Sequence, residues 1–206
     1  MGNSKENQSP ILVKIANQLL KDQQELDSLA VQLSLGKAEA KDKFKEVKTE
    51  FREKLQDLKH TLSSEYKDSQ DWVKETNVAI DEFEKNLEES AEEVFEESKA
   101  NILKAAENLK AQIKRNPTSE KLFLLYTTYY EKAQLQLDVL EQNIQNKKAE
   151  LTDSYKHSIE EAKKSAKAII DKLNDKKEEA DFKTEIFKKE IGQVYEHLKK
   201  AVKALG

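Results

Sequence analysis

Residues 44–73 read FKEVKTEFREKLQDLKHTLSSEYKDSQDWV, and their apolar side chains recur at intervals of three, four and four residues. This spacing forms one apolar face on an α-helix, which has about 3.6 residues per turn. All the positions on this face except Ser69 are apolar or aromatic. They are Phe44, Val47, Phe51, Leu55, Leu58, Leu62, Tyr66, Ser69 and Val73. The stretch therefore predicts a long amphipathic helix.

A second apolar run continues the same spacing, with Ser98 as its one polar position. Its positions are Ile80, Phe83, Leu87, Ala91, Val94, Ser98, Ile102, Ala105, Leu109 and Ile113. The register loses one residue near Thr76 and Asn77, but neither glycine nor proline occurs between the two runs. We therefore expect one helix over 37–115, bent near residue 76, which would extend about 118 Å. Alternatively, residues 68–77 form a turn, because the polar residues 68–71 resemble the start of a new helix.

The strongest break in the chain is Asn116-Pro117-Thr118-Ser119, because proline disfavours a helical conformation at the residue before it. We expect the chain to reverse there and a helix to follow over 119–173, folded back along 60–115. Its apolar face has fifteen positions, of which only Lys148 is charged. After a weaker break near Asn174 and Asp175, a last helix is predicted over 176–205.

The first helix is expected over 10–35, since Ser9 can cap it, Pro10 fits its first turn and Gly36 can end it. Its apolar residues follow a seven-residue pattern, which is typical of coiled coils. Asp22 is the single residue that interrupts this stripe.

Composition supports helices throughout. The chain has 206 residues, of which 37% are charged, with only four glycines and two prolines. So few chain breakers leave little room for strands joined by turns. The chain has no cysteine, which excludes disulfides, thiolate nucleophiles and iron–sulfur clusters.

Residues with catalytic or metal-binding chemistry are sparse. The three histidines, His60, His157 and His197, lie outside any Glu-x-x-His pair of the kind that holds metals in helical bundles. The chain has neither a glycine-rich phosphate loop nor a nucleophile elbow. We therefore expect no enzyme activity, no catalytic, cofactor or metal site, and no cofactor.

Charge is uneven along the chain, since residues 71–100 hold eleven acidic side chains and three lysines. This stretch is either a docking surface for a basic partner or a solvated helical face, and the solvated face is favoured because exposed charge pairs contribute little. Nucleic-acid binding is not expected, because the net charge is −4 and only two arginines occur. The nine residues from Leu122 to Tyr130 are apolar around most of their helix, so we expect them in the core rather than on an exposed binding surface.

These patterns predict an all-α fold, an elongated antiparallel bundle of long, coiled-coil-like helices. Residues 10–206 are expected to form a single helical domain after a disordered segment 1–9. No apolar run approaches the length of a membrane span, and we expect a cytoplasmic protein. The favoured function is a non-enzymatic scaffold that binds another protein or a second copy of itself through its helices.

The eleven-residue spacing over 44–173 resembles the pattern of exchangeable apolipoproteins and of late-embryogenesis helical proteins. The resemblance implies amphipathic helices that close over one another in water and spread on lipid, so reversible binding to a lipid surface is the alternative function. The chain departs from the apolipoprotein pattern because Pro117 is the only proline within these residues. A membrane-curving helical dimer of the BAR type is a further alternative, against which the net acidity stands.

Overall fold

The computed structural model describes residues 10–25, 37–91, 94–145, 152–175 and 184–203. All regular structure within these ranges is helical, which confirms the all-α prediction. The helices are α1 (Pro10–Glu25), α3 (Lys37–Glu65), α4 (Gln70–Glu89), α5 (Phe95–Lys114), α6 (Glu120–Ile144), α7 (Asp153–Asp175) and α8 (Thr184–Lys203).

The chain divides into two compact units, whereas the sequence predicted one domain over 10–206. Unit 2 is continuous in sequence, Leu35–Lys147, and contains α3 to α6. Unit 1 combines the residues on either side of unit 2, so that α1 belongs with α7 and α8. The two apolar runs of unit 1 are therefore separated in sequence by a complete bundle.

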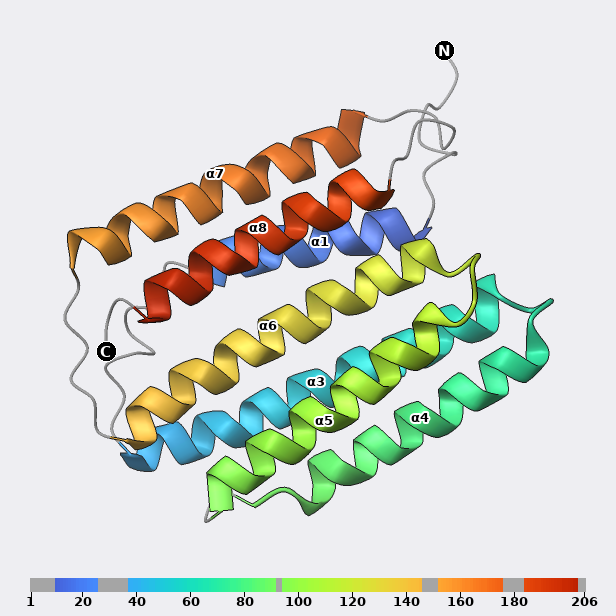
Figure 1. The fold of residues 1–206 in the computed structure, drawn as a ribbon, viewed down its shortest axis with the longest axis horizontal. Helices are drawn as coiled ribbons and strands as arrows, with labels where there is room; N and C mark the ends of the chain where they lie inside the picture. Colours follow the sequence, from blue (N-terminus) through green and yellow to red (C-terminus); the bar gives the residue numbers. More distant parts are fainter. Residues whose placement is uncertain (1–9, 26–36, 92–93, 146–151, 176–183, 204–206) are drawn as a thin grey trace. The chain divides into compact units, whose positions relative to one another are not determined.

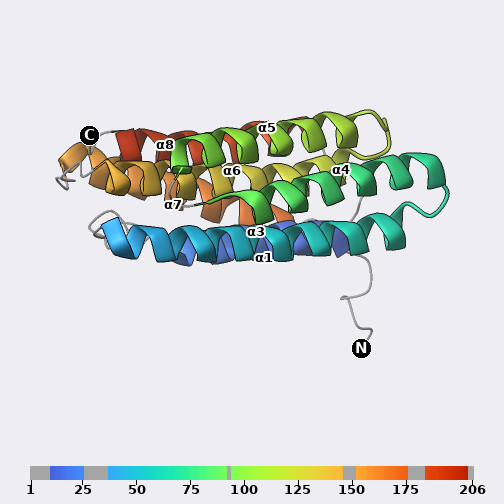
Figure 2. The same ribbon diagram turned by 90° about the horizontal axis from the view of Figure 1, so that it is seen from below.

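Unit 2 is a four-helix bundle in which each helix runs antiparallel to the next (Figure 1). The helix α3 packs on α4, α4 on α5, α5 on α6, and α6 on α3, which closes the ring. The view from below shows α4 and α5 side by side (Figure 2). The predicted apolar face of α3 is buried from Phe44 to Leu62, because it points into this bundle. The bundle also confirms the predicted chain reversal at Asn116–Ser119.

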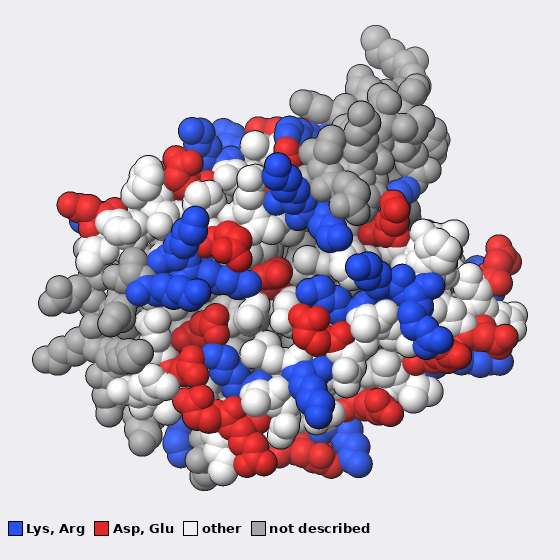
Figure 3. All heavy atoms as spheres, viewed as in Figure 1, with Lys and Arg blue, Asp and Glu red and all other residues white. Residues whose placement is uncertain are grey.

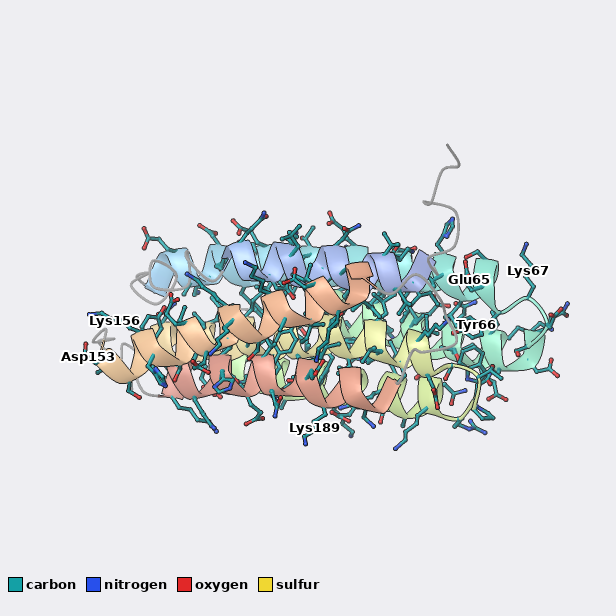
Figure 4. All side chains as sticks on the ribbon, turned by 90° about the horizontal axis from the view of Figure 1, so that it is seen from above. Glu65, Tyr66, Lys67, Asp153, Lys156 and Lys189 are labelled. Atoms are coloured by element: carbon teal, nitrogen blue, oxygen red, sulfur yellow. The ribbon has the colours of Figure 1, made fainter. Side chains whose placement is uncertain are left out.

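The single helix predicted over 37–115 is wrong, because the structure has three helices there. The first break is the turn after α3, where Tyr66 lies (Figure 4), and Ser69 occupies the N-cap position of α4. The alternative, a turn over 68–77, is correct in that the chain turns here, but the turn covers 66–69 and residues from Gln70 onward already belong to α4. Two turns let the long apolar stripe fold against itself, whereas a straight helix would leave it in water.

The second break, between α4 and α5, needs no glycine or proline because serine hydroxyls satisfy the backbone there. Ser90 Oγ donates to the carbonyl of Asn86 at 2.7 Å. Ser98 Oγ accepts from the Ala91 amide at 3.0 Å and donates to the Ala91 carbonyl at 2.9 Å. Lys48 Nζ, from α3, donates to the Ser90 carbonyl at 2.6 Å. These bonds replace the intrahelical bonds that a helix end loses.

The apolar register also shifts at this break. Val94, which the sequence placed on the buried face, is 50% exposed, and its neighbour Phe95 is buried instead. Phe95 packs edge-on against Phe44, with ring centroids 5.1 Å apart. Further along α5, Ala106 is buried where Ala105 was expected.

The helix predicted over 119–173 is also divided, because α6 ends at Ile144 and α7 begins at Asp153 in the other unit. Residues 146–151, which include Lys148, lie outside the described residues. The helices predicted over 10–35 and 176–205 are described over Pro10–Glu25 and Thr184–Lys203. The expected disorder of residues 1–9 likewise lies outside the described residues.

The described part of unit 1 consists of α1, α7 and α8. The helices α7 and α8 are consecutive and antiparallel, and α1 packs on α7 (Figure 1). Its α1 runs antiparallel to α7 and parallel to α8. Buried side chains recur along each helix at helical spacing, and they include Ile15, Leu19, Ile159, Ala162, Ile169, Val194 and Leu198.

Candidate functional site

The three histidines lie on three different helices. His60 is exposed on α3, His157 is exposed on α7, and His197 is half-buried on α8. Among the described residues, no group of His, Cys, Asp or Glu side chains has the arrangement needed to hold a metal ion. The absence of catalytic, cofactor and metal sites stays a prediction, since residues outside the described ranges are not covered.

The acidic stretch 71–100 is bound in large part to cations of unit 2. Lys59 of α3 contacts Asp81 at 2.6 Å and Glu84 at 2.8 Å, both on α4. Arg115, after α5, contacts Glu75 of α4 at 3.2 Å. These pairs join neighbouring helices. Asp81, Glu84 and Glu75 therefore take part in contacts within unit 2, while docking of a basic partner on this stretch stays a prediction.

Two less exposed lysines join α6 to its neighbours. Lys132 of α6, which is 7% exposed, contacts Glu50 of α3 at 2.5 Å. Lys99 of α5 contacts Asp138 at 2.7 Å and Glu141 at 2.8 Å. Burial acts to lower the pKa of Lys99, but hydrogen bonds and charge from these two carboxylates outweigh burial and raise the pKa.

The apolar segment from Leu122 to Tyr130 is buried except for Phe123, which is half-buried. The expectation that this segment belongs to the core is thus confirmed. Its Tyr126 is fully buried and donates from its hydroxyl to the Ala106 carbonyl of α5 at 2.7 Å. Burial raises the pKa of Tyr126 well above its ordinary value. Burial and a hydrogen bond with Glu107 raise the pKa of Tyr130 as well.

The lone tryptophan lies near the turn between α3 and α4. Trp72 packs edge-on against Tyr66, with ring centroids 5.3 Å apart. Its indole Nε1 donates to the Gln112 carbonyl of α5 at 3.1 Å. These contacts join segments of α4 and α5 and the turn after α3 at one end of the bundle. The fluorescence emission of Trp72 therefore reports on the packing of unit 2.

Asp22 forms the polar cluster of unit 1. It is 9% exposed and accepts a hydrogen bond from the Tyr195 hydroxyl of α8 at 2.6 Å. Gln18, one turn earlier in α1, donates to its other oxygen at 2.6 Å. Sequence analysis marked Asp22 only as an interruption of the apolar stripe. An acidic residue within an apolar stripe is the signal for a buried carboxylate, and the sequence contains it. The donor, Tyr195, lies 173 positions away, so no local pattern could identify this partner.

Charged side chains of both signs are interspersed on the face shown in Figure 3. Lys156 of α7 and Lys189 of α8 point outward (Figure 4). The helix α1 differs, because Val13 and Leu20 are 39% and 44% exposed and lie two helical turns apart on one side. Thus α1 presents apolar side chains on a face other than its buried stripe.

No known protein family, curated protein or solved structure matches the chain. None of the described helices combines the length and apolar character needed to cross a membrane.

Proposed function

We propose that this chain is a non-enzymatic helical interaction protein of the cytoplasm, which binds another protein or a second copy of itself through its helices. The observation that carries the proposal is that α1 has apolar side chains on two faces. Ile15 and Leu19 are buried, while Val13 and Leu20 remain exposed. Apolar side chains on a second face of a helix favour contact with a further helix. Lys99, Lys132 and Asp22 are engaged in contacts between helices, which supports a structural role for these three side chains.

Self-association is tested by light scattering and sedimentation across a wide range of protein concentrations. We expect reversible association of the wild-type chain, and weaker association of the double variant Val13→Gln and Leu20→Gln. The matched control is Asn17→Gln, because Asn17 is exposed on the same helix but is already polar. Association that is identical in all three proteins would exclude the exposed face of α1 as the contact surface.

Lipid binding is the competing function, and it belongs to a different class. If the helices open onto lipid, vesicles should carry the protein in flotation experiments, and Trp72 emission should shift to the blue. The interaction proposal predicts that the protein does not float with vesicles. Its helix content and Trp72 emission should also stay unchanged when vesicles are added, because the helical faces stay packed. Clear flotation at physiological salt would reverse the ranking of the two functions.

A further inference from the structure

The helices of unit 1 are connected to one another through unit 2. The helix α1 precedes Leu35, and α7 follows Lys147, so all of unit 2 lies between them in the sequence. Nevertheless α1 packs on α7, and the two helices are antiparallel (Figure 1). The end of α1 at Glu25 and the start of α7 at Asp153 therefore belong to the same end of unit 1.

Unit 2 brings its own two ends together in the same way. It has four helices, each antiparallel to the next, so the chain returns to the end of the bundle where it entered (Figure 1). The helix α3 begins at Lys37, α6 ends at Ile144, and these two helices pack on each other. The folded bundle thus contains more than half of the chain while it keeps its first and last helical residues at one end.

The length of chain that must close when α1 packs on α7 depends on the state of unit 2. With unit 2 folded, the connection outside the helices consists of residues 26–36 and 145–152, about 19 residues. With unit 2 unfolded, the connection is the whole segment 26–152, about 127 residues. The entropic cost of closure rises as 3/2 RT times the logarithm of this length. Unfolding of unit 2 should therefore lower the equilibrium constant for α1 packing by roughly 17-fold.

The helix α1 is the element that responds to this change. The helices α7 and α8 follow each other directly, so unit 2 does not enter the connection between them. The helix α1 has 16 residues, and an isolated helix of this length is marginal in water. Once released, α1 should lose helical structure and expose Ile15 and Leu19, which are buried in the folded chain.

We propose that unit 2 is a conformational switch for α1. Folded unit 2 holds α1 on α7 by shortening the connection between them, and opening of unit 2 releases α1 with its apolar stripe. The coupling passes through the chain itself and requires no ligand. It is reciprocal, so packing of α1 stabilises unit 2 by the same factor. This inference goes beyond the proposed interaction function, and it does not depend on the exposed face of α1.

The first test changes the connection and leaves both units intact. About 60 glycine and serine residues are inserted after Lys147 in the full-length chain, and hydrogen exchange of the α1 amides is measured. The connection grows from about 19 to about 79 residues, so the protection of α1 should fall roughly eightfold. Unchanged Trp72 emission verifies that unit 2 stays folded. The matched control has the same insertion before Ser9, outside the loop, and should retain wild-type protection of α1.

The second test opens unit 2. Leu125 is fully buried in α6, and Leu125→Pro breaks this helix. We expect Trp72 emission to shift to the red and the protection of α1 to fall roughly 17-fold, with a smaller change in α7 and α8. Addition of the glycine–serine insertion to Leu125→Pro should reduce the protection of α1 by less than about twofold more, because the open loop is already long.

The two tests have separate contradicting outcomes. Equal protection of α1 with and without the insertion after Lys147 would overturn the proposal, even if Leu125→Pro unfolds the entire chain. Wild-type protection of α1 in a Leu125→Pro chain whose Trp72 emission is that of an open bundle would overturn it as well. An eightfold loss from the insertion in the folded chain, reduced to less than about twofold in the Leu125→Pro chain, would support it.

Discussion

Lys132 of α6 lies 2.5 Å from Glu50 of α3, and its side chain is 9% exposed in the centre of a helical interface. Gln136, one turn further along α6, donates to the second oxygen of Glu50 at 3.2 Å. The pair thus joins two helices through a carboxylate that has several partners, and its removal should be felt in the stability of unit 2.

Glu50→Gln should lower the free energy of unfolding by about 3 kcal/mol, because it removes the negative charge that the buried ammonium of Lys132 contacts at 2.5 Å. The double variant Glu50→Gln and Lys132→Met should lose less than the sum of the two single variants. Urea unfolding of all four proteins measures this coupling. Strict additivity would show that the two side chains do not interact.

Stability should fall at alkaline pH. The pKa values of Tyr126, Tyr130 and Lys99 are raised in the folded chain, so the folded state retains protons that the unfolded state releases. Their contribution is fully present below about pH 10 and is lost as pH rises through the folded pKa values. Tyrosinate absorbance should therefore show at least two tyrosines that ionise only as helix content falls. Ionisation of all six tyrosines without loss of helix would contradict this.

Leu125→Ala should reduce the free energy of unfolding by about 2–5 kcal/mol, because Leu125 is fully buried and its truncation leaves a cavity. Val78→Ala is the matched control, since Val78 is 56% exposed on α4 and should change stability by less than about 0.5 kcal/mol. An unchanged melting curve together with lost self-association would identify the Leu122–Tyr130 segment as an interface instead.

Spin labels at positions 52 and 88 distinguish a helical hairpin from a rod. The Arg52 guanidinium contacts the Glu88 carboxylate at 3.4 Å, so the two helices bring these positions together. A continuous helix would separate them by about 54 Å, given 36 residues at 1.5 Å each. Labels at Arg52 and Lys45, within α3, provide an internal reference that both arrangements share. A long distance between 52 and 88 would exclude the hairpin.

Gly192→Ala should raise the free energy of unfolding by about 1 kcal/mol. Gly192 lies inside α8, where glycine is less favourable than alanine by about this amount. A Cβ atom added there meets no other atom within 4 Å, so the gain is not offset by a clash. Thermal unfolding at neutral pH measures the change. Destabilisation by this substitution would contradict the open space found around this position.

The sequence predicted the helical class, the reversal at Pro117 and most of the buried face of α3, because each depends on local spacing and on strong chain breakers. It failed at the junction of α4 and α5, because Ser98, in the first turn of α5, binds the backbone of Ala91 through hydrogen bonds that no glycine or proline marks in the sequence. The resulting shift exchanges Val94 for Phe95 in the core. The rings of Phe95 and Phe44 pack together although the two residues lie in different helices. Helical periodicity describes positions within one helix, so it cannot predict this contact.

The buried polar sites follow the same rule. Asp22 interrupts an apolar stripe that the sequence shows, whereas Lys132 lies beside the predicted apolar face of its helix and carries no such signal. Their partners Glu50 and Tyr195 come from helices that approach only after folding. A polar residue within an apolar stripe is therefore a useful marker of a buried pair, but its partner has to be found in three dimensions.

Unit 1 is built from two segments that lie on either side of unit 2 in the sequence, so its helices are synthesised at different times. The segment Pro10–Glu25 emerges early, whereas α8 is completed only when Lys203 has been added. At about 5–20 residues per second, the interval is on the order of 10–35 s. Unit 2 is synthesised in full during this time, so the nascent chain can form a finished bundle while α1 still lacks its partner helices. For that interval its apolar stripe must be shielded by a chaperone or tolerated in water.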